Sequence, residues 1–261
     1  MPAVYLGRDL GTGPLVMGSS VCQADESARR PASMSWYRHH WWWVGVVVAA
    51  GVVVYLAVAW GDLDIEQRVM LGSFLVLLLH EAEEWAWPGG EPAVLNKVIT
   101  RSPMGKVIGA GASEENADRY PSNANSAMVV NVFAAYPVYI LAVIFSDQIW
   151  LGLFAAFFFW LGQLVFHGVL TNLVLKSGYN PGLLTTVAGV ALGIYYAYHV
   201  ESSNLASAWD WIGALLLLPV FAVVVMLKLT FTWLADKDSP YRFTDAEMRK
   251  WNVDARLARH H

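Results

Sequence analysis

The stretch WWWVGVVVAAGVVVYLAVAWG, residues 41–61, contains no charged residue. At a rise of about 1.5 Å per residue, a helix of this length crosses the roughly 30 Å hydrocarbon layer of a membrane. Further predominantly apolar blocks of similar length lie at residues 69–87, 127–146, 149–174, 181–200 and 207–235. The sequence therefore predicts an all-α fold, a polytopic transmembrane helix bundle of about six spans.

The composition of the 261 residues favours this class and excludes others. Hydrophobic residues make up 56% of the chain and charged residues 15%, against about 25% charged in an average soluble domain. The apolar blocks are continuous, which excludes the alternating strands of a membrane barrel. A single cysteine, Cys22, excludes an intrachain disulfide, and a net charge of −4 gives no footprint for nucleic acid.

Lys and Arg are distributed unequally among the connections between spans. Fifteen of the seventeen lie in the N-tail, the 88–126 loop, the 175–180 turn and the C-tail, which share one side of the predicted bundle. Because positive residues beside spans stay in the cytoplasm, both termini are predicted to be cytoplasmic. The protein itself is predicted to lie in the inner (cytoplasmic) membrane. The predicted domains are a flexible N-tail (1–40), a six-helix domain (41–235) with a cytoplasmic 88–126 loop, and a C-tail (236–261) with a short surface helix.

The second predicted span contains an unusual group of ionisable residues, in LLLHEAEEW at residues 77–85. A charged residue near mid-membrane costs about 2.5–3.5 kcal/mol, so such residues need partners, protonation or a wet cavity. On a helix, His80, Glu83 and Glu84 fall within one arc of about 100°. Glu81 lies to the side, where snorkelling or pairing is expected. Three ionisable groups are thus expected to converge on one point.

A second histidine is expected at the same depth. His80 and His167 both lie about seven residues from the inner end of their spans, and the two spans run in the same direction. On a regular α-helix, Gln163 and Thr171 would flank His167 on its own face, whereas Asn172 would point elsewhere. Other polar residues predicted in the same half of the membrane are Asn131, Tyr179 and Asn180.

The pattern His80-x-x-Glu83-Glu84 inside a hydrophobic span, followed by an intramembrane histidine, resembles the HXXEE-domain family of multi-span bacterial membrane proteins. His167 is the counterpart of the second histidine of that family. The resemblance covers roughly residues 69–200. It implies metal binding or enzymatic activity at these residues and supplies no substrate.

The pattern predicts a membrane-embedded metal-dependent enzyme, a hydrolase or an oxygen-using oxidoreductase, that acts on a lipidic or apolar substrate. Imidazole nitrogens and carboxylate oxygens suit a divalent metal such as Zn or Fe, with His80, Glu83, Glu84 and His167 as ligands. His80, Glu83 and Glu84 are also the candidate catalytic residues, with one glutamate as general base. The residues predicted to support the site are Asn131, Gln163, Thr171, Tyr179 and Asn180.

Two alternative functions remain open. A metal-free acid-base isomerase or cyclase of sterol- or isoprenoid-like lipids would use a glutamate that its low-dielectric surroundings keep protonated. A proton or ion transporter would use the same groups as a relay, although no chain of ionisable residues reaches the outer half of the membrane. The long 88–126 connection predicts either a lid or a flexible tether. The predicted partners are membrane lipids and the apolar substrate.

Overall fold

The computed structural model describes residues 32–259, and their regular secondary structure is entirely helical. The predicted all-α class is confirmed. The chain divides into a unit that ends at Trp36 and a second unit that starts at Tyr37, to which the fold and the site described below belong. Most of the predicted N-tail, residues 1–31, lies outside the described residues. The first helix, α1, begins at Ala32, earlier than the predicted boundary at residue 41.

Among the described residues, five helices are long and apolar enough to cross a membrane, which is consistent with a multi-pass membrane protein. Three of them contain wide π-type turns and carry several labels. The first two are α1 (Ala32–Ala59) and the helix formed by α5 (Ala124–Val130), η5 (Asn131–Ala135) and α6 (Tyr136–Ile144). The third is formed by α7 (Ile149–Gly152), η6 (Leu153–Phe158), α8 (Phe159–Gln163), η7 (Leu164–Thr171) and α9 (Asn172–Leu175). The last two are α10 (Leu183–Ser202) and the helix formed by α11 (Ala208–Val220) and η8 (Phe221–Trp233).

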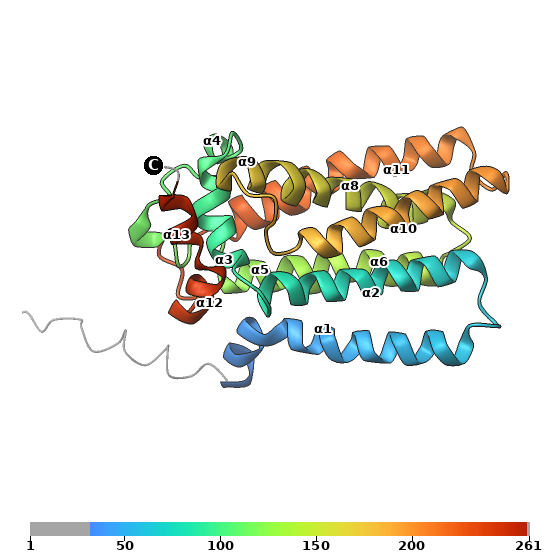
Figure 1. The fold of residues 1–261 in the computed structure, drawn as a ribbon, viewed down its shortest axis with the longest axis horizontal. Helices are drawn as coiled ribbons and strands as arrows, with labels where there is room; N and C mark the ends of the chain where they lie inside the picture. The colour runs from blue at the N-terminus through green and yellow to red at the C-terminus, as the bar shows by residue number, and fades with distance from the viewer. Residues whose placement is uncertain (1–31, 260–261) are drawn as a thin grey trace, which may run out of the picture. The chain divides into compact units, whose positions relative to one another are not determined.

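Helix α2 (Ile65–Trp85) is 21 residues long but less apolar than these five, because it carries the HEAEE stretch. Its start is fixed by Asp64, whose carboxylate accepts a hydrogen bond from the Gln67 backbone N–H at 2.6 Å. It runs beside α6 and α10 (Figure 1) and buries His80, Glu81, Glu83 and Glu84. The sixth span at α2 stays a prediction.

Close packing of α10 against the helix that carries His167 depends on two glycines. A Cβ atom on Gly189 would lie 2.1 Å from the ring of Trp160, and one on Gly193 would lie 2.1 Å from the carbonyl oxygen of Ala156. Only glycine fits at both positions. This close packing brings the start of α10 beside η7, where the candidate site forms.

The 88–123 connection is folded and does not form a free tether. Its short helices are α3 (Glu91–Ala93), η2 (Val94–Val98), η3 (Ile99–Arg101), α4 (Gly105–Ile108) and η4 (Glu114–Asn116). The buried Asn96 side chain fastens it, because its amide donates to the carbonyl oxygens of Ala117 and Ser122, both at 2.8 Å. A role as a lid over the site stays a prediction.

The C-terminal segment packs against this connection at the same end of the bundle (Figure 1). It contains α12 (Asp245–Arg249), η9 (Lys250–Asn252) and α13 (Val253–Ala258). The predicted short helix is present, and Thr244 and Glu247 form a capping box at the start of α12. Val253 and Leu257 are buried, so the segment is docked rather than lying freely on the surface.

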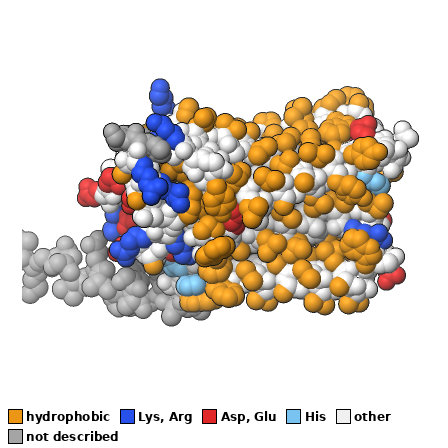
Figure 2. Space-filling model, in the orientation of Figure 1, with side chains coloured by type: hydrophobic (Ala, Val, Ile, Leu, Met, Phe, Trp, Pro, Cys, Tyr) orange, Lys and Arg blue, Asp and Glu red, His pale blue; other side chains and the backbone are white. Residues whose placement is uncertain are grey.

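Hydrophobic side chains cover the flank of the helices, and Lys and Arg gather at the end that carries α3, α12 and α13 (Figure 2). We call this end the basic end. An apolar flank between polar ends is the surface expected of a membrane-embedded bundle. Which side of the membrane the basic end faces stays a prediction.

Candidate metal centre

Three buried side chains meet toward the basic end of the bundle. His80 and Glu84 lie one turn apart on α2, and His167 comes from η7. The Nε2 atoms of His80 and His167 lie 3.2 Å and 2.9 Å from the same Glu84 oxygen, Oε1. The three ligand atoms lie within 4.8 Å of one another, and the imidazole rings are 5.0 Å apart. The two histidines that the sequence places at one depth thus lie side by side.

The hydrogen bonds of His80 decide which of its nitrogens carries a lone pair. Nδ1 lies 3.1 Å from the carbonyl oxygen of Gly182 and 2.9 Å from Oγ1 of Thr185. A carbonyl oxygen only accepts, so Nδ1 is the donor. In the neutral ring Nε2 then carries the lone pair, directed away from α10.

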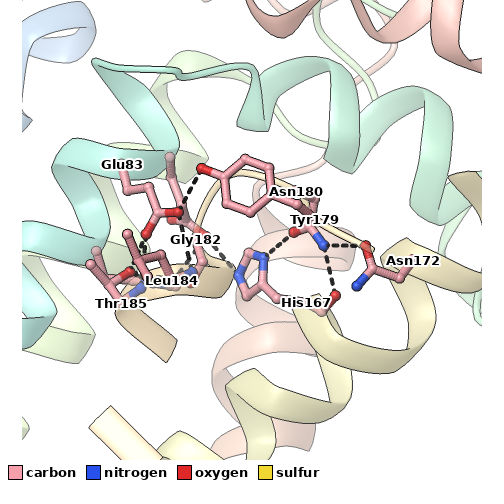
Figure 3. Close-up of polar contacts among 10 residues, drawn as sticks. Glu83, His167, Asn172, Tyr179, Asn180, Gly182, Leu184 and Thr185 are labelled. Atoms are coloured by element: carbon pink, nitrogen blue, oxygen red, sulfur yellow. Dashed lines mark hydrogen bonds and ion pairs between the residues drawn. The ribbon is translucent and has the colours of Figure 1, made fainter. Parts of the chain in front are cut away.

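His167 is held in the same tautomer by Asn180 (Figure 3). The Asn180 amide nitrogen donates to the His167 backbone carbonyl at 2.7 Å and to Asn172 Oδ1 at 2.8 Å. These two bonds orient the amide, so its oxygen accepts from His167 Nδ1 at 2.8 Å. In the neutral ring His167 Nε2 is therefore also a lone-pair atom, and Asn180, one of the predicted supporting residues, contacts His167 directly.

The donor set fits a divalent metal. Both Nε2 atoms are buried and have no hydrogen-bond partner among the described residues, although each lies close to the Glu84 carboxylate. Two ligands of one zinc or iron ion lie about 3.0–3.4 Å apart, as bonds of about 2.0–2.2 Å at tetrahedral or octahedral angles require. Lone pairs on neutral rings repel a carboxylate oxygen at these distances unless a proton or a metal ion lies between them. His80, Glu84 and His167 are thus the three residues that would hold the metal.

The π-type turns of η7 change the neighbours expected for His167. In such a turn the backbone hydrogen bonds run between residues i and i+5, which brings residue i+5 nearer to the face of residue i than in an α-helix, and Asn172 belongs to the hydrogen-bonded group through Asn180. The prediction that Asn172 points elsewhere was wrong because it assumed regular α-helical spacing. Thr171 is buried, and its hydroxyl has no hydrogen-bond partner in the part of the chain that the structure describes. Gln163 is half-buried and makes no hydrogen bond to the described residues of the site.

Gly182 brings the backbone against the site. It has φ of +93°, a left-handed conformation that favours glycine, and a Cβ atom there would lie 2.5 Å from Cε1 of His167. Its carbonyl oxygen accepts from His80. Gly182 therefore lies against both histidines. The sequence Tyr-Asn-Pro-Gly indicates a turn at this point but does not indicate that contact.

Glu83 belongs to the frame of the site rather than to the three converging ligand atoms. Its carboxylate accepts from the backbone N–H groups of Leu184 and Thr185, at 3.3 Å and 2.9 Å, and from the Thr185 hydroxyl at 2.6 Å (Figure 3). Tyr179 donates to it at 2.9 Å. Burial, and then the hydrogen bond to Glu83, raises the pKa of Tyr179, so this hydroxyl stays a donor. Glu83 thereby joins α2 to the first turn of α10.

Two further buried carboxyl groups lie near the centre, and one of them was not predicted. Glu81 is 1% exposed, so it does not snorkel to the surface, and Glu91 at the start of α3 is 4% exposed. One oxygen of each, Oε2, has no hydrogen-bond partner among the described residues. Burial, and then the charges of Glu84 and Glu81, raises the pKa of Glu91 well above its ordinary value. Glu91 lies outside the predicted spans, so span-based reasoning did not find it.

One predicted supporting residue lies apart, and one unpredicted residue takes part. Asn131 donates to the Ala127 carbonyl of its own helix at 3.1 Å and makes no hydrogen bond to the site. Trp160 packs its ring edge-on to His80, with ring centroids 5.5 Å apart, and donates to the Ser73 hydroxyl.

The fold and the buried histidine–glutamate centre together describe a helical protein of the multi-pass membrane class with a candidate metal site. Residues 71–197 match the family described as "Protein of unknown function with HXXEE motif", so the chain carries an HXXEE domain over this range. The resemblance read from the HXXEE pattern is confirmed there, and the matched range contains His80, Glu84 and His167. Comparisons with curated proteins and with solved structures gave no match.

Proposed function

We propose that this protein is a membrane-embedded metal-dependent enzyme that acts on a lipidic or apolar substrate. The single observation that supports this most strongly is the convergence of two histidine lone pairs on one Glu84 oxygen inside an apolar bundle. Nδ1 of each ring already has a hydrogen-bond acceptor, so in the neutral rings both buried Nε2 atoms present lone pairs toward this oxygen, as metal-ligating histidines do.

Two histidines and one carboxylate leave coordination positions open for a substrate or water. A zinc or iron ion bound there would polarise a substrate oxygen or lower the pKa of a water molecule. The residues of the chain would fix the ligands, with Nδ1 of His80 held by Gly182 and Nδ1 of His167 held by Asn180. Burial of all three ligands would keep competing water away from the reaction.

The substrate class follows from the surroundings of the site. The flank of the bundle is apolar, so molecules that reach the centre from that side dissolve in the bilayer (Figure 2). The proposed orientation puts the basic end in the cytoplasm, because Lys and Arg beside spans stay there. Hydrolysis and oxygen-dependent oxidation of such a substrate are both compatible with this ligand set.

A second candidate function is metal-free acid-base catalysis, for example an isomerase or cyclase of lipids. The observation that favours it is the pair of buried carboxyl groups, Glu81 and Glu91, each with one oxygen that has no hydrogen-bond partner within residues 34–259. The pKa of Glu91 is raised, so this group carries a proton at a pH where an exposed carboxyl group does not. A protonated carboxyl group in an apolar site is a general acid.

Metal analysis of the protein purified in detergent distinguishes the two candidates. The metal-dependent proposal expects about one zinc or iron per chain, and loss of turnover of a membrane lipid extract after chelation, restored by adding the metal. Metal-free protein whose turnover survives chelation and is lost in Glu91→Gln would replace it with the acid-base candidate. Retention of metal and turnover in His167→Ala would exclude this centre altogether.

A further inference from the structure

A pocket of about 410 Å³ opens on the outer surface of the bundle near its basic end. It lies where α9 ends and the chain turns toward α10. Its lining residues are Gly168, Val169, Asn172, Leu173, Lys176 and Ser177. None of them is among the three candidate metal ligands.

The pocket has an apolar wall and a cationic rim. Val169 and Leu173 are 45% and 70% exposed, as expected of side chains that face lipid on the flank of a membrane bundle. Lys176 follows the last residue of α9 and is exposed. Among residues 34–259, its ammonium group has no hydrogen-bond or ion-pair partner. The pocket is therefore lined by both a positive charge and apolar side chains.

This arrangement has the chemistry of a phospholipid at the edge of a bilayer. Where an apolar helix face meets the end of a span, a lipid headgroup lies beside the last residue and its acyl chains lie along the helix. A free inorganic phosphate would use Lys176 but gain nothing from Val169 and Leu173. A zwitterionic headgroup would not neutralise the unpaired ammonium group, whereas an anionic headgroup would.

The pocket is joined to the candidate metal centre by hydrogen bonds. Asn172 lines the pocket, and its Oδ1 accepts from the Asn180 amide at 2.8 Å. The Asn180 oxygen in turn accepts from Nδ1 of His167 at 2.8 Å (Figure 3). A ligand in the pocket thus lies two hydrogen bonds from His167.

We propose that this pocket binds one anionic phospholipid, with the headgroup phosphate on Lys176 and an acyl chain along Val169 and Leu173. The lipid is a bound ligand at a site of its own, and the proposal does not depend on the metal-dependent function. Binding is expected in metal-free and in metal-loaded protein alike.

Native mass spectrometry of the full-length protein in detergent tests the proposal, with phosphatidylglycerol and phosphatidylcholine of equal chain length as probes. Wild-type protein should retain one phosphatidylglycerol about fivefold more strongly than phosphatidylcholine, since one lysine near an anionic headgroup supplies an effect of this size. Lys176→Gln should remove the preference. Lys106→Gln is the matched control, because Lys106 is exposed on α4 and outside the pocket.

A second variant tests the apolar wall without changing charge. Val169→Trp fills the pocket and should also remove retention of phosphatidylglycerol. Equal retention by wild type and Lys176→Gln, or equal losses in Lys176→Gln and Lys106→Gln, would overturn the proposal. So would displacement of the lipid by inorganic phosphate together with full retention in Val169→Trp, because the site would then recognise a free anion.

Discussion

His80 and His167 come from different helices, yet their rings stand 5.0 Å apart at an angle of 88°, and their Nε2 atoms approach one Glu84 oxygen. Each ring is held from behind at Nδ1, by the Gly182 carbonyl and the Asn180 amide oxygen respectively. Two residues of one turn, Asn180 and Gly182, thus orient both Nε2 atoms toward one point. This arrangement is costly to build in an apolar interior unless it binds a cation.

The first prediction concerns these two histidines. His80→Ala and His167→Ala should each remove bound metal, measured as metal per chain by elemental analysis of folded, detergent-purified protein. The control is His199→Ala, because His199 lies at the opposite end of α10 and pairs with Glu66 at 3.0 Å. Equal metal content in all three variants and in wild type would show that the centre is structural.

The second prediction separates the two neighbouring glutamates. Glu84→Gln should lower metal affinity at least tenfold, because the shared ligand oxygen loses its charge. Glu83→Gln should keep the metal but lower stability by about 1–3 kcal/mol, because a charged acceptor of four hydrogen bonds is lost. Metal titration and thermal unfolding measure the two effects. If Glu83→Gln loses metal as fully as Glu84→Gln, Glu83 is a ligand, as the sequence pattern alone suggested.

The third prediction concerns Gly182. Gly182→Ala places a methyl group 2.5 Å from the His167 ring and a side chain on a left-handed residue, so it should cost about 1–3 kcal/mol of stability and weaken metal binding. Gly178→Ala is the matched control in the same turn, because a Cβ atom there meets nothing within 4 Å. Thermal unfolding and metal titration of both variants provide the test. Similar values for the two would show that Gly182 does not position His167.

Sequence reasoning located the centre because its strongest signals are local. Helical spacing placed His80 and Glu84 on one face, and the alternating direction of spans put His167 at the same depth. The partners that hold the histidines depend on contacts between helices, which spacing does not encode. Asn172 was misplaced because η7 contains π-type turns, and Glu91 was missed because it lies outside any apolar block. Gly182 was visible only as a turn residue.

The fourth prediction is a pH-sensitive attachment of the C-terminal segment. Burial acts to raise the pKa of Glu247, but hydrogen bonds from His39 and Thr244 outweigh it, so this pKa lies below its ordinary value of 4.5. A carboxyl group whose pKa is lowered on folding contributes stability above its unfolded pKa and loses it as the pH falls through the folded value. The protection of residues 236–259 against hydrogen exchange, relative to the intrinsic exchange rate at each pH, should therefore fall as the pH falls below about 4.5.

Two variants define that prediction. Glu247→Gln should show raised exchange in this segment already at neutral pH and little further change on acidification. Asp245→Asn is the control on the same helix, because Asp245 forms only an exposed ion pair with Arg249 at 3.7 Å. A pH response that persists unchanged in Glu247→Gln would assign it to another group.

The last prediction is the orientation of the bundle. In a Cys22→Ser background, Ile65→Cys and Leu205→Cys place thiols at exposed positions, one at the start of α2 and one between α10 and α11. Both lie at the end opposite to α12 and α13 (Figure 1). Because fifteen of the seventeen Lys and Arg lie in the tails and in connections on the other side of the predicted bundle, an impermeant thiol reagent should label both positions in intact cells. Lys106→Cys, at the basic end, should react only after lysis.

The reverse pattern would invert the bundle and put the candidate metal centre nearer the outer face. Labelling of residue 65 from one side and residue 205 from the other would mean that α2 and α10 do not start and end on the sides predicted for six spans.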